Sequence, residues 1–183
     1  MDIYKIIKER RSIRKYSAKD VTNDDLNKIL EAAGWAPSWV NTQCWEFIVV
    51  RDKNIKEALS NTLSRGNPSK DAVKDAPIVI VACARKGLTG FYKGKAVTDK
   101  GDWLLFDVAL AVENLTLTSH ALGLGTVIVG AFDSVKTAEI VKLPDELVVV
   151  SLIPIGYPDE NPTPPSRKKL KEIVSFNYYG EKE

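Results

Sequence analysis

The fold of this chain is decided by one apolar stretch, WLLFDVALAVENLTLTSHAL, at residues 103–122. No other helical pattern in the sequence is as apolar. Four polar residues interrupt it, Asp107, Glu113, Asn114 and His120, and a membrane span would not tolerate so many. We therefore expect a long central helix, mostly buried inside a water-soluble domain.

Outward from this helix, helical and strand patterns alternate along the chain. Helices are predicted at 2–10, 22–34, 52–63, 133–143 and 166–174, and strands at 47–50, 77–84, 126–129 and 148–155. Thr22, Asp52, Asp133 and Ser166 are the expected N-caps, and Gly34 ends its helix. This alternation alone predicts parallel β-α-β units, although it does not fix the strand order.

Length and composition limit the class of protein. The 183 residues predict one domain, 1–183, and a net charge of +2 gives no global field for nucleic acid. One histidine and two distant cysteines, Cys44 and Cys83, do not form a zinc or iron–sulfur site, so no metal is expected. Two thiols and the lack of a signal peptide favour the cytoplasm, with a disulfide as the alternative.

Most side chains that carry out difficult chemistry are missing. His120 lies within the apolar helix without a nucleophile elbow, and we interpret it as a packed or surface histidine. Gly123-Leu124-Gly125 lacks the third glycine of a dinucleotide motif and follows a helix, so it is read as a helix end. An enzyme of this composition would need a cofactor to supply the reactivity.

A cationic cluster, Arg10-Arg11-Ser12-Ile13-Arg14, follows the first predicted helix. Guanidinium groups bind phosphate through two parallel hydrogen bonds, and the serine hydroxyl adds another donor. The alternative is a solvated basic helix end, which the helix dipole also favours. Arg167, in the first turn of the last predicted helix, suggests a second contact with an anion.

Two further segments are informative. Residues 36–45 combine Ser, Asn, Thr and Gln with two tryptophans, which suits the edge of a flat heterocycle or, alternatively, a rigid packed turn. Residues 85–102 are the least regular part of the chain and the best candidate for a mobile lid. The proline-rich connector from Pro158 and the aromatic tail are too extended for one small domain, which favours a dimer.

Six motifs in order resemble the FMN-dependent nitroreductase family over nearly the whole chain. They are RRSIR (10–14), APSxxNxQ (36–43), GLGT (123–126), VGAFD (129–133), LIPIGYP (152–158) and RKKLxEIV (167–174). The resemblance implies a three-layer α+β fold, with a mixed and mostly antiparallel sheet around a long central helix. It also implies an intertwined homodimer with FMN at the subunit interface, and it replaces the parallel expectation.

The resemblance also implies roles for residues. Arg10, Arg11, Ser12, Arg14 and Arg167 would hold the phosphate and ribityl end, and Pro37, Ser38, Asn41 and Gln43 would reach the flavin from the other subunit. Ile128, Val129, Gly130 and Ala131 would line the ring, with one backbone N–H near its N5 atom. Trp39 or Trp103 could stack on an aromatic acceptor, or simply pack in the core. No side chain is expected to act as a catalytic residue.

The implied activity is an oxidoreductase in which NADH or NADPH reduces the flavin and a nitroaromatic, quinone or related acceptor reoxidises it. Alternatives are a dehalogenase-like or flavin-fragmenting relative, a protein that stores or senses FMN, and a basic interaction module without cofactor. Two departures from the family pattern matter: Cys44 stands where many relatives have proline, and residues 85–103 match no family motif. The acceptor therefore does not follow from the resemblance.

Overall fold

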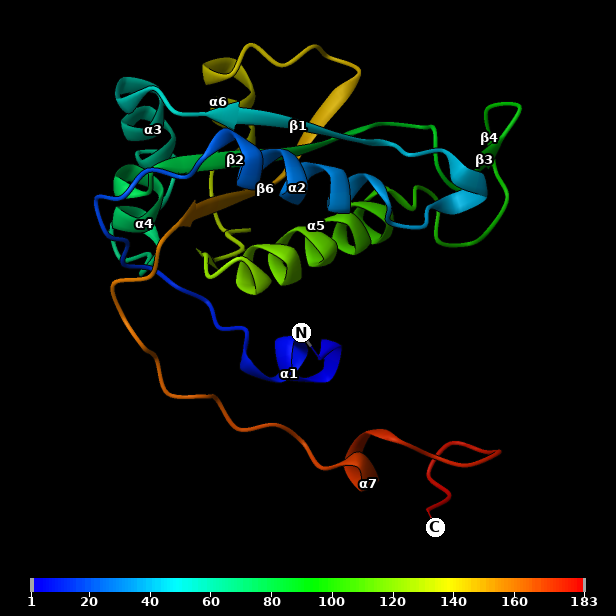
Figure 1. Ribbon diagram of the computed structural model, residues 1–183. Helices are drawn as coiled ribbons and strands as arrows, with labels where there is room; N and C mark the ends of the chain where they lie inside the picture. Colours follow the sequence, from blue (N-terminus) through cyan, green and yellow to red (C-terminus); the bar gives the residue numbers. More distant parts are fainter. Residues whose placement is uncertain (1, 183) are drawn as a thin grey trace.

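A four-stranded sheet forms the middle of the molecule in a computed structural model that describes residues 2–182 (Figure 1). Its order is β1 (Trp45–Val50), β2 (Ile78–Arg85), β6 (Leu147–Gly156) and β5 (Gly125–Thr126). All three pairs of strands are antiparallel, and an isolated bridge between Ser12 and Thr126 is parallel. The mostly antiparallel sheet is confirmed, and the parallel β-α-β prediction is wrong.

Helices cover both faces of this sheet, which gives three layers (Figure 1). α2 (Asn23–Gly34) and α5 (Leu104–Ala121) cover one face, and α3 (Lys53–Ser60), α4 (Lys70–Asp75) and α6 (Ser134–Ile140) cover the other. Residues 78–84 of β2 are all buried, because alternate side chains enter the two cores. Its unbroken apolar run therefore reflects cover on both faces, which an antiparallel strand can have as well as a parallel one.

The long helix α5 confirms the central element of the prediction. Val108, Ala111, Val112 and Leu115 are buried between α2 and the sheet. The helix ends at Gly123, whose φ of +78° is left-handed, and the Leu124 N–H donates to the Ser119 carbonyl at 2.8 Å. The Gly-Leu-Gly segment is thus a helix end. No helix within residues 2–182 is long and apolar enough to cross a membrane.

Several element boundaries differ from the prediction. The helices capped by Asp52 and Asp133 end early, at Ser60 and Ile140, and α4 was not foreseen. The strand predicted at 126–129 is reduced to two residues of β5 plus a single bridge from Val129 to Leu152. Residues 85–102 hold a small hairpin of β3 (Phe91–Tyr92) and β4 (Lys95–Ala96).

The last helix, α7 (Leu170–Ile173), corrects one functional argument. Its N-cap is Lys169 rather than Ser166, because the Glu172 carboxylate accepts the Lys169 N–H at 2.6 Å. Arg167 therefore lies in the extended connector and not in a helical first turn. α7, like α1 (Ile3–Glu9), lies at the side of the molecule away from the sheet (Figure 1).

Candidate functional site

A cationic pocket joins two distant parts of the chain. Its volume is about 290 Å³, and it is lined by Arg10, Arg11, Ser12, Arg14, Pro162, Thr163, Pro165 and Arg167. All five residues that the sequence analysis assigned to phosphate therefore line one pocket. The four guanidinium groups and one hydroxyl are a donor set suited to a compact anion.

Backbone pairing brings these segments together. The Ile13 N–H donates to the Thr126 carbonyl at 2.9 Å, which fixes the cluster beside β5. The Asp159 N–H donates to the Lys15 carbonyl at 2.9 Å, and the Glu160 carboxylate accepts the N–H groups of Arg14 and Lys15. The connector is thus fastened beside the cluster just before it reaches Arg167.

The arginines of this cluster are not equivalent. Arg14 Nε donates to Ser69 Oγ at 3.2 Å, in the loop before α4. Arg11 Nη1 donates to the carbonyls of Lys8 and Arg10 at 2.6 and 2.8 Å, and it therefore satisfies acceptors at the C-terminal end of α1. The alternative reading, a basic helix end, thus describes part of what Arg11 does.

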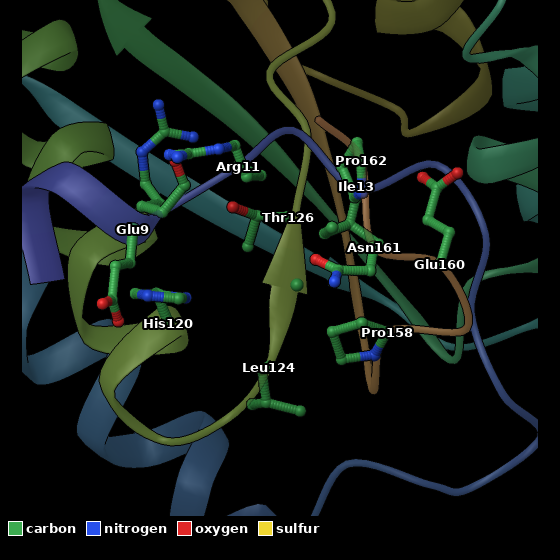
Figure 2. Close-up of a pocket in the computed structure, with 12 residues that line it drawn as sticks. Glu9, Arg11, Ile13, His120, Leu124, Thr126, Pro158, Glu160, Asn161 and Pro162 are labelled. Carbon is green, nitrogen blue, oxygen red and sulfur yellow. The ribbon is translucent and has the colours of Figure 1, made fainter. Parts of the chain in front are cut away.

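A smaller pocket of about 200 Å³ adjoins the cationic pocket on the other side of Arg10 and Arg11. Figure 2 shows Glu9 and His120 on one side of it and Asn161 and Glu160 on the other. Burial lowers the pKa of His120, and among the nearby charges Glu9 raises it while Arg10 and Arg11 lower it. This places His120 at the packed C-terminal end of α5, as a neutral imidazole at neutral pH.

The loop at residues 37–43, which contains the 3-10 helix η1 (Trp39–Asn41), has a strained backbone. Val40, Asn41 and Gln43 have φ values of +45°, +56° and +49°. Such angles are unfavourable for residues with a side chain, above all for β-branched valine, and they cluster at functional sites. Strain of this kind persists only where surrounding contacts impose it.

Side chains of this loop face an open cleft of about 700 Å³, whose lining includes Pro37, Asn41 and Gln43. Ser38 serves the loop itself, since its Oγ accepts the Gln43 N–H at 2.9 Å. Thr42 Oγ1 is buried and finds no hydrogen-bond partner among residues 2–182. A buried hydroxyl without a partner is costly, so this loop is suited to an additional polar contact.

Trp39 and Trp103 are in contact, although 63 residues lie between them in the sequence. Their ring centroids are 5.2 Å apart, and Phe106 packs edge-on against Trp103 at 5.3 Å. Trp103 Nε1 donates to Thr98 Oγ1 at 3.0 Å, which ties the indole to the 85–102 segment. The two indoles therefore pack against each other, and the stacking of either one on an acceptor stays a prediction.

The turn at Ile128, Val129, Gly130 and Ala131 lies beside the loop before α4. The Val129 N–H already donates to the Leu152 carbonyl at 2.9 Å, so Val129 is not the free donor expected in this turn. Asn67 Nδ2 donates to the Ala131 carbonyl at 3.1 Å, and Asn67 Oδ1 accepts the Ser69 N–H at 2.9 Å. The sequence analysis missed Asn67 and Ser69, although Asn67-Pro68-Ser69 is a turn signal.

The two groups of candidate residues lie at opposite ends of α5. Trp39 contacts Asp107 in the first turn of this helix, and Ser12 pairs with Thr126 just beyond its last turn. An 18-residue helix is about 27 Å long. The loop at 37–43 and the cationic pocket therefore lie apart from each other within one chain.

Comparison with known proteins defines the class. The family model described as the nitroreductase family matches residues 7–157. A relative from Methanothermobacter thermautotrophicus, provisionally named NADH dehydrogenase/NAD(P)H nitroreductase, is 36% identical over 88% of this chain and 80% of its own length. This chain belongs to the nitroreductase family, as its motifs predicted.

Solved structures agree in fold. An FMN-dependent nitroreductase from Clostridium difficile is 32% identical with a TM-score of 0.81, covering 96% of this chain and 99% of that one. A provisionally named nitroreductase in complex with FMN, from Exiguobacterium sibiricum, is 25% identical with a TM-score of 0.82, covering 97% and 98%. The three-layer α+β fold expected from the motifs is therefore confirmed.

Proposed function

We propose that this chain is an FMN-dependent NAD(P)H oxidoreductase that reduces a nitroaromatic, quinone or related small acceptor. The observation that carries this proposal is the cationic pocket, which gathers Arg10, Arg11, Ser12, Arg14 and Arg167 from both ends of the sequence. The names of the Clostridium and Exiguobacterium structures support FMN as the cofactor, and the name of the Methanothermobacter relative supports NAD(P)H.

The residues present fit a flavin mononucleotide. Four arginines and a serine match a phosphate. The carboxylate of Glu160, in the connector, accepts the backbone N–H groups of Arg14 and Lys15. Gln43 Nε2 donates to Asn41 Oδ1 at 3.2 Å, and the remaining amide groups, Asn41 Nδ2 and Gln43 Oε1, suit the polar edge of the ring. Because the Val129 N–H donates to the Leu152 carbonyl, we propose Ile128, Gly130 or Ala131 as the source of the N–H near the flavin N5 atom.

We further propose that the active species is a homodimer. The loop at residues 37–43 and the cationic pocket lie at opposite ends of α5, a helix about 27 Å long, which supports a partner subunit as the source of the loop at each site. Apolar side chains of α1, α7 and the tail are exposed, with Tyr4 70%, Leu170 75% and Tyr178 74% accessible. Surfaces of this kind usually meet a partner.

When bound, the flavin would supply the redox chemistry, accepting hydride from a nicotinamide and delivering electrons to the acceptor. The protein residues would hold the phosphate, orient the ring and restrict access to it. Trp39 and Trp103 provide an aromatic wall for a planar acceptor beside the 85–102 segment. Nicotinamide and acceptor would use the same space in turn, which predicts ping-pong kinetics.

Arginine substitutions test the phosphate assignment. Each arginine–phosphate contact is worth about 1.5–3 kcal/mol, so Arg14→Ala and Arg167→Ala should each weaken FMN binding by about 10- to 150-fold. Lys168→Ala is the matched control, because it removes an exposed cation beside Arg167 that does not line the pocket. Flavin fluorescence quenching gives the affinities. Wild-type affinity in both arginine variants would refute the assignment.

A second measurement tests the reaction itself. NADH or NADPH should bleach the visible absorbance of the flavin-loaded protein under anaerobic conditions. Adding a nitroaromatic or a quinone should restore the colour. Bleaching without reoxidation by any acceptor would favour an FMN storage protein. A colourless protein that does not take up FMN would exclude both the oxidoreductase and the storage protein.

A further inference from the structure

A buried carboxylate on α5 has no part in the proposed function described so far. Asp107 lies in the first turn of this helix and is 1% exposed. No ion pair includes it among residues 2–182. A buried charge without a cation is expensive unless hydrogen bonds satisfy it, so its bonding partners indicate what it is for.

Those partners come from the two segments that flank the proposed ring site. The Trp39 N–H is shared between Asp107 Oδ1 and Oδ2, at 3.2 and 3.1 Å. The hydroxyl of Thr89, itself fully buried in the 85–102 segment, donates to Asp107 Oδ2 at 2.6 Å. Hydrogen bonds to a carboxylate are among the stronger ones in proteins.

A third donor is Cys44, at the position where the family resemblance leads us to expect proline. Its Sγ lies 3.9 Å from Asp107 Oδ2. Burial, with the Asp107 charge as the next cause, raises the pKa of the Cys44 thiol to about 11, so the thiol keeps its proton. Proline would have no donor here, and the cysteine adds one weak bond to the same carboxylate.

The antiparallel sheet explains why the two segments meet. Trp45 at the start of β1 lies opposite Ala84 near the end of β2, and the Arg85 N–H donates to the Cys44 carbonyl at 2.9 Å. The loop at 37–43 enters β1 at the same end of the sheet where the 85–102 segment leaves β2. Asp107 accepts hydrogen bonds from both segments at this end of the sheet.

We propose that Asp107 is a positioning residue that anchors both segments, the strained 37–43 loop through Trp39 and the 85–102 segment through Thr89. The inference rests on the proposed function only in assigning the loop to the flavin and the segment to the acceptor. It explains how the left-handed conformations of Val40, Asn41 and Gln43 are maintained, because the loop is fastened at Trp39, directly before the first of them.

Thr89→Val tests one arm of this anchor with little change in side-chain volume. Hydrogen exchange of amides in 86–102 should become about tenfold faster, whereas amides of 38–43 and of β2 should change less than about twofold. The KM for the acceptor should rise about fivefold, with FMN affinity unchanged. Thr116→Val is the matched control, because Thr116 is equally buried on α5 but bonds only to Glu113.

Asp107→Asn tests both arms together. The amide oxygen is uncharged and therefore accepts the Trp39 and Thr89 hydrogen bonds more weakly than the carboxylate, so exchange should accelerate about tenfold in both 38–43 and 86–102, while β2 stays protected. FMN affinity and acceptor KM should then weaken together. Equal acceleration throughout the protein would mean a merely structural role, and no change in either segment would also overturn the proposal.

Thr89→Val remains decisive if Asp107→Asn does not fold. Unchanged exchange in 86–102 in that variant would refute the anchor. The exchange measurements are made on the full chain without added ligand, so they are independent of flavin chemistry. A wild-type protein that binds no FMN would therefore refute the proposed function, and the exchange measurements would still test the anchoring role of Asp107.

Discussion

The cationic pocket and the 37–43 loop achieve their shapes by different physical means. The pocket places charged side chains of Arg10, Arg14 and Arg167 on a backbone without positive φ angles, where attraction does not require exact placement. The loop has polar uncharged groups on a left-handed backbone that a buried carboxylate fastens. One region depends on charge, and the other depends on a conformation that its surroundings must enforce.

This difference predicts different sensitivities. Charge at a partly exposed pocket is screened by salt, so ligand binding there should weaken as ionic strength rises. A conformation held by buried hydrogen bonds is insensitive to salt but vulnerable to small steric changes nearby. Gly125 lies beside the pocket, and Gly90 lies in the 85–102 segment, which shares the Asp107 carboxylate with the loop, so both regions can be tested without altering a charged or hydrogen-bonding side chain.

The largest effect is expected for Gly90→Ala, which disturbs the 85–102 segment next to Thr89. A Cβ atom there would clash with the Gly101 carbonyl oxygen and lie 2.5 Å from Trp103 Cδ1, at a φ of +82°. We expect a loss of about 2–5 kcal/mol in the free energy of local opening, since overpacking and the unfavourable φ add. Hydrogen exchange of 86–102 measures it.

Gly87→Ala is the control for that substitution. Its φ is +68°, yet a Cβ atom would have no heavy atom within 4 Å, so it should show the backbone cost alone, about 1 kcal/mol. If both variants loosened the segment equally, close packing against Trp103 would not be what holds it.

Gly125→Ala should have a smaller effect, directed at the cationic pocket. Its Cβ would lie 2.7 Å from Ile13 Cβ and Cγ1, and Ile13 stands between Ser12 and Arg14. We expect a destabilisation of about 1–3 kcal/mol from overpacking. FMN affinity should fall about tenfold, which corresponds to about 1.4 kcal/mol, because the displaced backbone carries the arginines.

Gly66→Ala is the control here, since a Cβ at that position meets open space and φ is not positive. Calorimetry and fluorescence titration should show little change in it. A Gly125→Ala protein with full FMN affinity would mean that the pocket tolerates displacement of its backbone, and that charge alone accounts for binding.

The smallest effect concerns His120, the single histidine of the chain. Burial lowers its pKa in the folded protein, so the unfolded chain binds more protons near pH 6. Its contribution to stability is present above about pH 6.5, the ordinary value, and is lost as pH falls through the lowered folded pKa. His120→Gln should therefore flatten the dependence of the melting temperature on pH in this range.

The same histidine reports on the neighbouring pocket. Arg10 and Arg11 lower its pKa, so an anion that neutralises them should raise it. An NMR titration of the imidazole with and without FMN measures the shift. An unchanged histidine pKa on FMN binding, with Arg14→Ala still weakening that binding, would place the phosphate away from Arg10 and Arg11.

Elements with strong local signals were predictable from sequence. The apolar run of α5, the Thr22 cap of α2 and the Gly123 helix end all depend on neighbouring residues, and the structure confirms each. The sheet direction was not predictable from alternation alone, because β2 and β6 are neighbours in space although far apart in the chain. The family motifs supplied that direction.

The candidate site divides in the same way. A cluster of arginines is visible in the sequence itself, and the five residues assigned to the phosphate do line one pocket. Arg167 was predicted to lie in the first turn of a helix capped by Ser166. The helix instead begins after Lys169, whose N–H donates to the Glu172 carboxylate. Asp107 looked like a polar interruption in an apolar helix, and nothing in its neighbours revealed contacts with Trp39 and Thr89.

The closure of the cationic pocket by Arg167 also sets an order of events during synthesis. Ser12 and Arg14 leave the ribosome early, but the wall formed by Pro162, Pro165 and Arg167 emerges only after every strand of the sheet has been made. A nascent or truncated chain that ends before the connector has the arginines without the enclosure. Retention of an anion by this pocket therefore reports that translation has passed residue 167.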